Sequence, residues 1–518
     1  LRVFPPSKLE GWVAANLQPS TDFTLAVKET VRHICEFLKQ HCFENGTRVL
    51  KTVKGGSAGK GTALRNNSDA DVVLFLNCFS SYRDQQCQRT EILTLIEKRL
   101  LECSQSLSFT VSITKPRYKG RSLSLTLHSS DKLESIDVDI LPAYDALGRD
   151  RDGAGRGTVW DGGQGPSLPT GQVTQDGPPD PKVYVNLLAM GSSPGEFSTC
   201  FTELQKKFVK RCSAKPKDLL RLVKYWYKQV LKPQYPGAEL PPKYALELLS
   251  IYAWEQGTAS SDAFSMADGF RTVLELLCQY QDICVYWEKY YSLQHEQIGT
   301  HLKALLRQPR PVILDPADPT GILGQGKQWD LVAKEAARCR ALPCVASACP
   351  WNVQPARPVT VKVKQLQGTT LSKTVSPSTT ILELKAEIEQ KWGIPRYQQR
   401  LAQHQPAGNS LILHDRDSLA THGIFYDTML LLLQTPPQEM EIFVNDFKNK
   451  TNTYIVQRTD TVWQLKMKIY DRQGVPAEQQ CLTYGTKQLE NHNTLEHYDV
   501  QPKSTIYLLL RLRGGTSP

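Results

Sequence analysis

Residues Lys51 to Asn77 read KTVKGGSAGKGTALRNNSDADVVLFLN and contain the pattern from which the first half of the fold can be inferred. A glycine-rich turn from Gly55 to Gly61 precedes two aspartates, Asp69 and Asp71, which lead into the apolar run Val72 to Leu76. An apolar run bounded by turn residues predicts a buried strand, and side chains two apart on a strand share a face. The stretch therefore predicts two neighbouring carboxylates beside a loop whose backbone amides can approach a phosphate.

Two other interpretations account for parts of this stretch. A P-loop needs a glycine where Lys54 stands and a Ser or Thr where Gly61 follows Lys60, so that motif is excluded. A polar hairpin with two solvated aspartates explains Asp69 and Asp71 alone. It does not explain why a glycine loop precedes them and a second carboxylate strand follows.

The second carboxylate strand is predicted for Glu134 to Leu141, which read ESIDVDIL. Asp137 and Asp139 alternate with β-branched residues, which indicates a strand with one polar, functional face. Oxygen ligands suit Mg²⁺, and three carboxylates from neighbouring strands could hold the two Mg²⁺ ions of a phosphoryl displacement. The predicted chemistry is nucleotidyl transfer.

The motifs GGSAGKGT, SDADVV and DVDILPAYDALG resemble the 2′-5′-oligoadenylate synthetases, which are double-stranded-RNA-activated members of the polymerase-β-like nucleotidyltransferase superfamily. The resemblance extends to about Asn352. It implies that Asp69, Asp71 and Asp139 are the catalytic residues and the ligands of two Mg²⁺ ions. Some members of the family have lost this triad and the activity, whereas this sequence retains all three carboxylates.

The resemblance also assigns residues to the nucleotide and to RNA. It implies that ATP is bound by Gly56, Ser57, Arg221, Lys224, Lys243 and Tyr244. Lys243 stands where the family often has Gln, which changes the contact expected at the nucleobase. The resemblance also places Lys39, Lys54, Lys206, Lys210 and Lys215 on a face that binds double-stranded RNA. Without the resemblance, a solvated helix surface is the preferred interpretation of the basic run from Lys206 to Lys217, in which Pro216 is expected to separate two helices.

The region after Pro358 has a different pattern, an internal repeat of Val359 to Gln434 and Glu439 to Gly515. In each unit a Thr precedes an amphipathic helix that ends at Gly-x-Pro, and the second unit closely resembles ubiquitin. Ubiquitin's recognition patch maps to Phe447, Thr483 and Leu509, where Thr replaces an apolar residue. The terminal Gly514-Gly515 raises conjugation as an alternative, but a fixed module that binds partners is the preferred interpretation.

The fold class expected is α+β: a polymerase-β-like lobe and a helical lobe, followed by two ubiquitin-like β-grasp domains. The expected boundaries are 1–160, 183–352, 358–434 and 439–515, with a Gly- and Pro-rich flexible loop from Gly148 to Lys182. Asp315 and Asp318 are expected to cap turns. Zinc is considered for Cys339, Cys344 and Cys349, but the spacing favours free thiols.

Composition limits the cellular setting. The chain has 518 residues, and Lys+Arg 62 against Asp+Glu 52 gives a net charge of +10, most of it before Pro358. No apolar run suggests a membrane span and no signal peptide is recognisable, and thirteen cysteines without a disulfide framework fit a reducing cytoplasm.

Three functions remain open from sequence. The first is an interferon-induced antiviral enzyme that polymerises ATP into 2′-5′-linked oligoadenylate when RNA binds. The second is a non-catalytic adaptor, because the resemblance implies that ubiquitin-like tails can stimulate an RNA-sensing helicase. The third, a cyclic-dinucleotide synthase, is disfavoured because no inserted zinc-ligand cluster is found.

Overall fold

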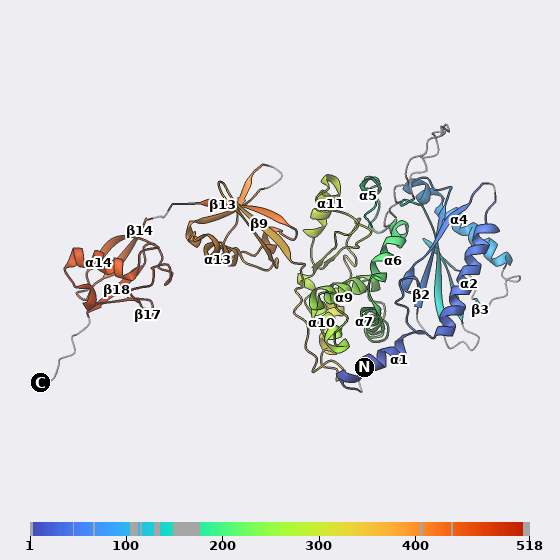
Figure 1. Ribbon diagram of the computed structural model, residues 1–518, viewed down its shortest axis with the longest axis horizontal. Helices are drawn as coiled ribbons and strands as arrows, with labels where there is room; N and C mark the ends of the chain where they lie inside the picture. The colour runs from blue at the N-terminus through green and yellow to red at the C-terminus, as the bar shows by residue number, and fades with distance from the viewer. Residues whose placement is uncertain are drawn as a thin grey trace, which may run out of the picture. The chain divides into compact units, whose positions relative to one another are not determined.

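The computed structural model describes residues 4–44, 46–65, 68–103, 112–113, 117–128, 135–148, 177–404, 408–436 and 439–510. The chain divides into two compact units, Leu1–Pro358 and Val359–Pro518 (Figure 1). Most of the loop predicted from Gly148 to Lys182, and Gly514-Gly515, lie outside the described residues. No helix among the described residues is both long and apolar enough to cross a membrane.

The first unit opens with a mixed sheet and its helices. Its elements are α1 (Leu9–Leu17), α2 (Thr21–Gln40), β1 (Val49–Lys54), α3 (Gly56–Lys60), β2 (Ser68–Leu76), α4 (Tyr82–Cys103), β3 (Ser112–Ile113), β4 (Arg117–Lys119), β5 (Ser122–His128) and β6 (Ser135–Ala143). The strand order is β1-β2-β6-β5-β3, with β4 paired to β5. Only the β2–β6 pair is parallel among these pairings.

Alternation along the strands gives the sheet two different faces. Ala70, Val72, Leu74 and Leu76 of β2 are buried in one core with apolar residues of α2 and α4. These two helices lie on the same side of the sheet (Figure 1). Because side chains alternate along a strand, the aspartates of β2 and β6 point to the opposite face. The predicted division of each strand into an apolar and an acidic face is confirmed.

The rest of the first unit is mainly helical. It contains α5 (Pro181–Ala189), α6 (Thr202–Lys210), α7 (Ala214–Trp226), α8 (Lys232–Gln234), α9 (Lys243–Thr258), α10 (Met266–Cys278), β7 (Cys284–Val285), α11 (Glu296–Leu306), β8 (Val312–Ile313) and α12 (Trp329–Cys339). A π-helical turn, Tyr227–Leu231, follows α7 directly.

Two local expectations in this helical part differ from the structure. Pro216 does not separate α6 from α7; it lies in the first turn of α7, where its missing N–H costs nothing. The N-terminal α1, which the predicted boundaries place with the sheet lobe, contacts the helical part: the Trp12 ring lies 5.3 Å from that of Tyr225 on α7. Two other predictions are confirmed, because Asp315 and Asp318 accept hydrogen bonds from the N–H of Ala317 and Thr320.

The second unit contains two copies of one fold. The first copy has β9 (Val359–Gln365), β10 (Thr370–Val375), α13 (Ile381–Trp392), β11 (Gln399–His404), β12 (Ser410–Ile412) and β13 (Thr428–Gln434). The second has β14 (Glu439–Asn445), β15 (Thr451–Gln457), α14 (Val462–Gln473), β16 (Gln480–Tyr484), β17 (Lys487–Gln488) and β18 (Thr505–Leu510). Their strand orders are equivalent, β10-β9-β13-β11-β12 and β15-β14-β18-β16-β17.

Matching details confirm that these copies are an internal repeat. Thr380 and Thr461 each form a capping box at the start of the helix, and each helix ends at a glycine with positive φ. Gln399 and Gln480 are both fully buried, and each side chain donates one hydrogen bond to a backbone carbonyl within the helix and one to a carbonyl two residues after the helix ends.

Candidate active site

The parallel pairing of β2 with β6 places four aspartates on one face of the sheet. Asp71 lies directly opposite Asp139, and Asp69 lies opposite Asp137. All four belong to the face turned away from the α2 and α4 core. The predicted triad of Asp69, Asp71 and Asp139 is thus brought together at the level of the backbone.

The glycine loop lies directly against β2, the strand that carries Asp69 and Asp71. The N–H of Gly55 donates to the carbonyl of Asp71 over 2.7 Å, and the Ser57 hydroxyl donates to the carbonyl of Asp69 over 2.9 Å. Gly56 has a φ of +62°, and a Cβ there would lie 2.9 Å from both the Asp69 carbonyl oxygen and the Asp71 nitrogen. Only glycine fits this contact, so Gly56 shapes the site through its backbone. The turn predicted from Gly55 to Gly61 is largely the short helix α3, Gly56–Lys60.

The carboxylates differ in their electrostatic surroundings. Burial alone raises the pKa of Asp69, but the charge of Lys243 and the hydrogen bond from Ser57 outweigh it and hold that pKa well below its usual range. Burial, followed by the like charge of Asp69, raises the pKa of Asp71 to about 6. The two neighbouring carboxylates therefore differ: Asp69 is paired with a cation, whereas Asp71 is dominated by burial and by the like charge of Asp69.

The donor set fits a hard divalent cation, although the side chains do not converge as they stand. Among the described residues, no group of three or more Asp, Glu, His or Cys side chains is arranged to hold a metal ion. Asp69 is turned to Lys243 Nζ, and Asp139 accepts a short hydrogen bond from Ser124. The raised pKa of Asp71 indicates a place where a cation would be stabilised. Asp69 and Asp139 could serve as oxygen ligands of such a cation only after leaving these partners.

Arg221 and Lys224 of α7 are bound to the loop that follows the glycines. The Arg221 guanidinium donates to the carbonyls of Gly61 and Ala63 over 2.7 and 3.0 Å. Lys224 is buried, donates to Thr62 and pairs with Glu247 at 3.3 Å. In this conformation both cations hold the loop, and their assignment to the ATP triphosphate stays a prediction.

Lys243 and Tyr244 open α9, next to the carboxylates. Lys243 Nζ lies 3.2 Å from Asp69 Oδ2. The Lys60 ammonium lies 4.0 Å from the centre of the Tyr244 ring, and the Tyr244 hydroxyl donates to Asp315 over 3.3 Å. A nucleobase stacked on Tyr244 would therefore have to share or displace Lys60, and base stacking stays a prediction.

Three of the five predicted RNA-binding lysines interact electrostatically, because burial and then the charges of Lys210 and Lys54 lower the pKa of Lys206. Burial raises the pKa of the Cys35 thiol of α2, and the charges of Lys54 and Lys39 oppose that rise. Lys215 is engaged elsewhere, because its ammonium pairs with Glu10 at 2.9 Å and lies 5.2 Å from the Phe264 ring.

Three charged residues of the site have no role assigned from the sequence: Lys60, Lys228 and Glu247. Glu247, whose side chain is 6% exposed, pairs with Lys60 and with the predicted Lys224, and Lys228 is close enough to Asp69 to affect its pKa. Lys228 could have been assigned from the sequence, because it follows Lys224 by four residues, a spacing that places both on one helical surface. The sequence around Glu247 does not indicate its role, because its partners precede it by 187 and 23 residues.

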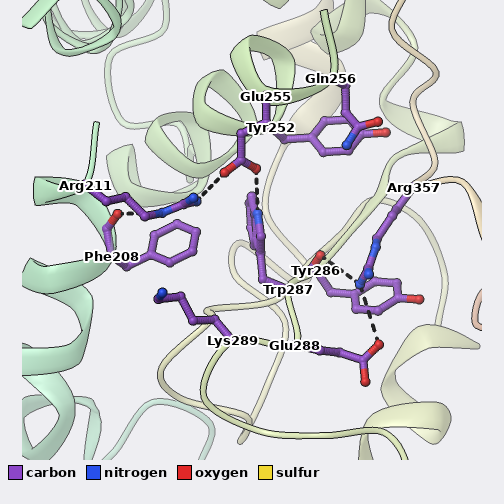
Figure 2. Close-up of a pocket in the computed structure, with 10 residues that line it drawn as sticks. All are labelled: Phe208, Arg211, Tyr252, Glu255, Gln256, Tyr286, Trp287, Glu288, Lys289 and Arg357. Carbon is purple, nitrogen blue, oxygen red and sulfur yellow. Dashed lines mark hydrogen bonds and ion pairs between the residues drawn. The ribbon is translucent and has the colours of Figure 1, made fainter. Parts of the chain in front are cut away.

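A separate pocket of about 280 Å³ lies in the helical part and shares no residue with the carboxylate site. In Figure 2 the Glu255 carboxylate faces both Arg211 and the indole of Trp287, which donates to it over 2.8 Å. The Arg357 guanidinium lies 4.4 Å from the centre of the Tyr286 ring. Four of its charged side chains, Arg211, Glu255, Glu288 and Arg357, thus interact with other residues that line the pocket, which indicates a structural role.

These features define a nucleotidyltransferase-fold protein with a helical second lobe and a tandem β-grasp tail. Residues 34–120 match the family described as "Nucleotidyltransferase domain", and residues 177–357 match "2'-5'-oligoadenylate synthetase 1, domain 2, C-terminus". Residues 359–433 and 442–513 match the "Ubiquitin family".

Comparison with complete related proteins indicates the same family. The 2'-5'-oligoadenylate synthase-like protein 2 of Mus musculus is 40% identical, over 98% of this chain and 97% of the relative. The 2'-5'-oligoadenylate synthase-like protein 1 of Rattus norvegicus is 38% identical over 99% and 98%. The 2'-5'-oligoadenylate synthase 1A of Rattus norvegicus is 42% identical over 66% of this chain and 92% of the relative. The chain belongs to the 2'-5'-oligoadenylate synthetase family and has the domain composition of its synthase-like members. The predicted family and fold class are confirmed.

Proposed function

We propose that this chain is a double-stranded-RNA-activated 2′-5′-oligoadenylate synthetase that polymerises ATP with Mg²⁺. The observation that carries the proposal is the register of β2 and β6. It sets Asp71 opposite Asp139 on the sheet face beside the loop from which Gly55 and Ser57 hydrogen-bond to β2. A structural protein has no need for aligned carboxylates beside a glycine loop.

The reaction joins the 2′-oxygen of an acceptor adenylate to the α-phosphorus of ATP and breaks the bond to pyrophosphate. Asp69, Asp71 and Asp139 would hold Mg²⁺, which supplies charge neutralisation of the triphosphate and activation of the hydroxyl when bound. The glycine-loop amides position the phosphates, and Lys60 adds positive charge beside them. Because backbone hydrogen bonds fix the loop and Glu247 holds Lys60, the loop is organised before the nucleotide arrives.

The predicted RNA-binding lysines are connected to the carboxylate site through β1 and α6. Lys54 ends β1 and immediately precedes Gly55, whose N–H is bonded to Asp71. Lys206 and Lys210 lie on α6, and the first residue of α6, Thr202, is so close to Gly55 that a Cβ there would lie 2.4 Å from its methyl group. Phosphates bound across these lysines would press α6 and β1 together, next to the glycine loop.

The test compares wild type with Asp139→Asn, which keeps the shape of the side chain but removes its charge. Asp22→Asn, an exposed carboxylate on α2, is the matched control. Asp139→Asn should lower RNA-dependent product by at least a hundredfold while RNA affinity stays within twofold, and Asp22→Asn should behave as wild type. Equal product from Asp139→Asn and wild type would refute the triad.

A second function, partner binding by the tail, is favoured by an exposed apolar surface in the second β-grasp copy. Phe447, Tyr507 and Leu509 are 43%, 50% and 53% exposed. The resemblance suggests an RNA-sensing helicase as the partner. Leu509→Lys should abolish stimulation of such a helicase and leave oligoadenylate synthesis intact, whereas Leu366→Lys, at a 74% exposed position of the first copy, should change neither. Stimulation unaffected by Leu509→Lys would exclude this surface.

A further inference from the structure

The ammonium group of Lys243 lies at the candidate metal site. Lys243 Nζ is 3.2 Å from Asp69 Oδ2, and the two side chains are 32% and 38% exposed. Lys243 is the first residue of α9, in the helical lobe, whereas Asp69 belongs to β2 in the sheet lobe. The ion pair therefore joins two lobes through the side chain from which a metal ligand is expected.

This ion pair is reinforced by its charged surroundings. The charges of Lys224 and Lys228, also from the helical lobe, act on Asp69 without a direct contact. A divalent cation bound to Asp69 would be repelled by these ammonium groups. Lys243 is the one in direct contact, and it stands where the resemblance leads us to expect an uncharged Gln.

The geometry of the triad is consistent with occupation of this position by Lys243. Asp71 and Asp139 are opposite each other in the register, yet the described side chains form no metal-binding group. Asp69 is turned to Lys243 and Asp139 to Ser124. A half-exposed ion pair adds little to stability. We therefore expect the Lys243–Asp69 ion pair to affect the binding of a divalent cation to Asp69, rather than the stability of the fold.

We infer that Lys243 is a positioning residue that occupies the Asp69 side of the metal site in the resting protein and competes there with divalent cations. The inference rests on the proposed function, because it assumes that the three carboxylates bind metal. When ATP and metal bind together, Lys243 exchanges the Asp69 carboxylate for the triphosphate, the nearest new anion. Productive metal binding is thereby coupled to nucleotide binding, and metal alone binds weakly.

The test measures Mn²⁺ binding to the full chain by electron paramagnetic resonance of the free ion, so it does not depend on activity. Lys243→Gln and Lys243→Met remove the charge, and Lys243→Arg keeps it. Lys327→Gln is the control, because Lys327 forms a comparable 3.1 Å ion pair with Glu239, between residues outside the carboxylate site. Thermal unfolding of each variant confirms that it is folded.

Without nucleotide, Lys243→Gln and Lys243→Met should bind Mn²⁺ at least tenfold more tightly than wild type. Lys243→Arg and Lys327→Gln should stay within twofold. With a non-hydrolysable ATP analogue present, the difference between Lys243→Gln and wild type should fall below threefold, and Lys243→Gln should bind the analogue more weakly.

The contrary outcomes separate the inference from the proposed function. Mn²⁺ binding that Asp139→Asn abolishes but Lys243→Gln leaves within twofold of wild type would overturn the role of Lys243 and leave the triad standing. A difference that persists undiminished with the analogue would overturn the exchange onto the triphosphate. No Asp139-dependent Mn²⁺ binding in either wild type or Lys243→Gln would overturn both the inference and the metal-dependent function.

Discussion

Replacing Glu247 with Gln should destabilise the first unit through the cations that this residue neutralises. The Glu247 carboxylate pairs with Lys224 at 3.3 Å and Lys60 at 3.4 Å, and the three side chains are 6%, 3% and 13% exposed. Removing one partner of a buried ion pair costs about 3–5 kcal/mol, because the other charge remains buried without compensation. Lys60 and Lys224 also contact the glycine-loop region, so the damage should reach the candidate site.

The expected change in melting temperature follows from the size of the unit. An unfolding entropy of ~2.1 cal/mol/K per residue gives roughly 0.75 kcal/mol/K for the 358 residues of the first unit. The loss of about 3–5 kcal/mol therefore lowers its melting temperature by about 4–7 °C. Seven of the nine tryptophans precede Pro358, so tryptophan fluorescence during heating reports mainly on this unit.

The matched control is Glu239→Gln, whose carboxylate is 72% exposed and pairs with Lys327. An exposed pair contributes less than about 1 kcal/mol, so its melting temperature should change by less than about 1.5 °C. A shift for Glu247→Gln no larger than that of Glu239→Gln would refute the reasoning.

The pH dependence gives an independent check of the same residue. Burial raises the pKa of Glu247, but the charges of Lys60 and Lys224 outweigh burial and leave it below the ordinary value of 4.5. A carboxyl group with a depressed pKa stabilises the fold above its unfolded pKa, and this contribution is lost as pH falls through the folded pKa. The stability difference between wild type and Glu247→Gln should therefore be complete above about pH 4.5 and shrink below it.

Three further predictions concern the loop, the carboxylates and the RNA face. Gly56→Ala should lower synthesis at least tenfold, because its Cβ would collide with β2, whereas Gly61→Ala, with open space around it, should cost only about 1 kcal/mol of stability for its positive φ. With metal chelated, Asp71→Asn should raise the melting temperature at pH 7.5 but not at pH 4. The reason is that the pKa of Asp71 is raised to about 6 in the folded protein, so its ionisation destabilises the fold as pH rises from the unfolded pKa through 6. An equal effect at both pH values would contradict this. Lys210→Gln should weaken duplex-RNA binding and reduce the salt slope by about 1, while Lys215→Gln, already paired within the protein, should do less in a polarisation assay; the reverse order would show that the RNA face is misassigned.

The elements that sequence could predict are those with a local signal. The period-two pattern of Asp69 and Asp71 against Val72 and Leu74 determines which face of β2 is acidic, and the structure confirms it. The repeat in the second unit was visible because each helix has its own start signal at Thr380 or Thr461. Such features depend on neighbours within a few residues of the chain.

The features that sequence could not predict depend on which distant residues meet. Nothing near Lys243 in the sequence indicates that it pairs with Asp69, which lies 174 residues earlier. Arg221 has the chemistry of a phosphate ligand, yet here it donates to backbone carbonyls after α3. Lys215 has the same chemistry as Lys210, but only the fold shows that Glu10 of α1 neutralises it. Residue type gave the chemistry available, and tertiary packing decided how each charge is used.

The most direct test of the central claim is to incubate the pure full chain with ATP and Mg²⁺, with and without duplex RNA, and to determine the linkage of the products. The account predicts oligoadenylates that form only with RNA, resist a 3′-5′-specific nuclease and disappear with Asp139→Asn. Tight RNA binding by wild-type protein without any oligoadenylate, at saturating ATP and Mg²⁺, would contradict it and leave partner binding by the ubiquitin-like tail as the function to pursue.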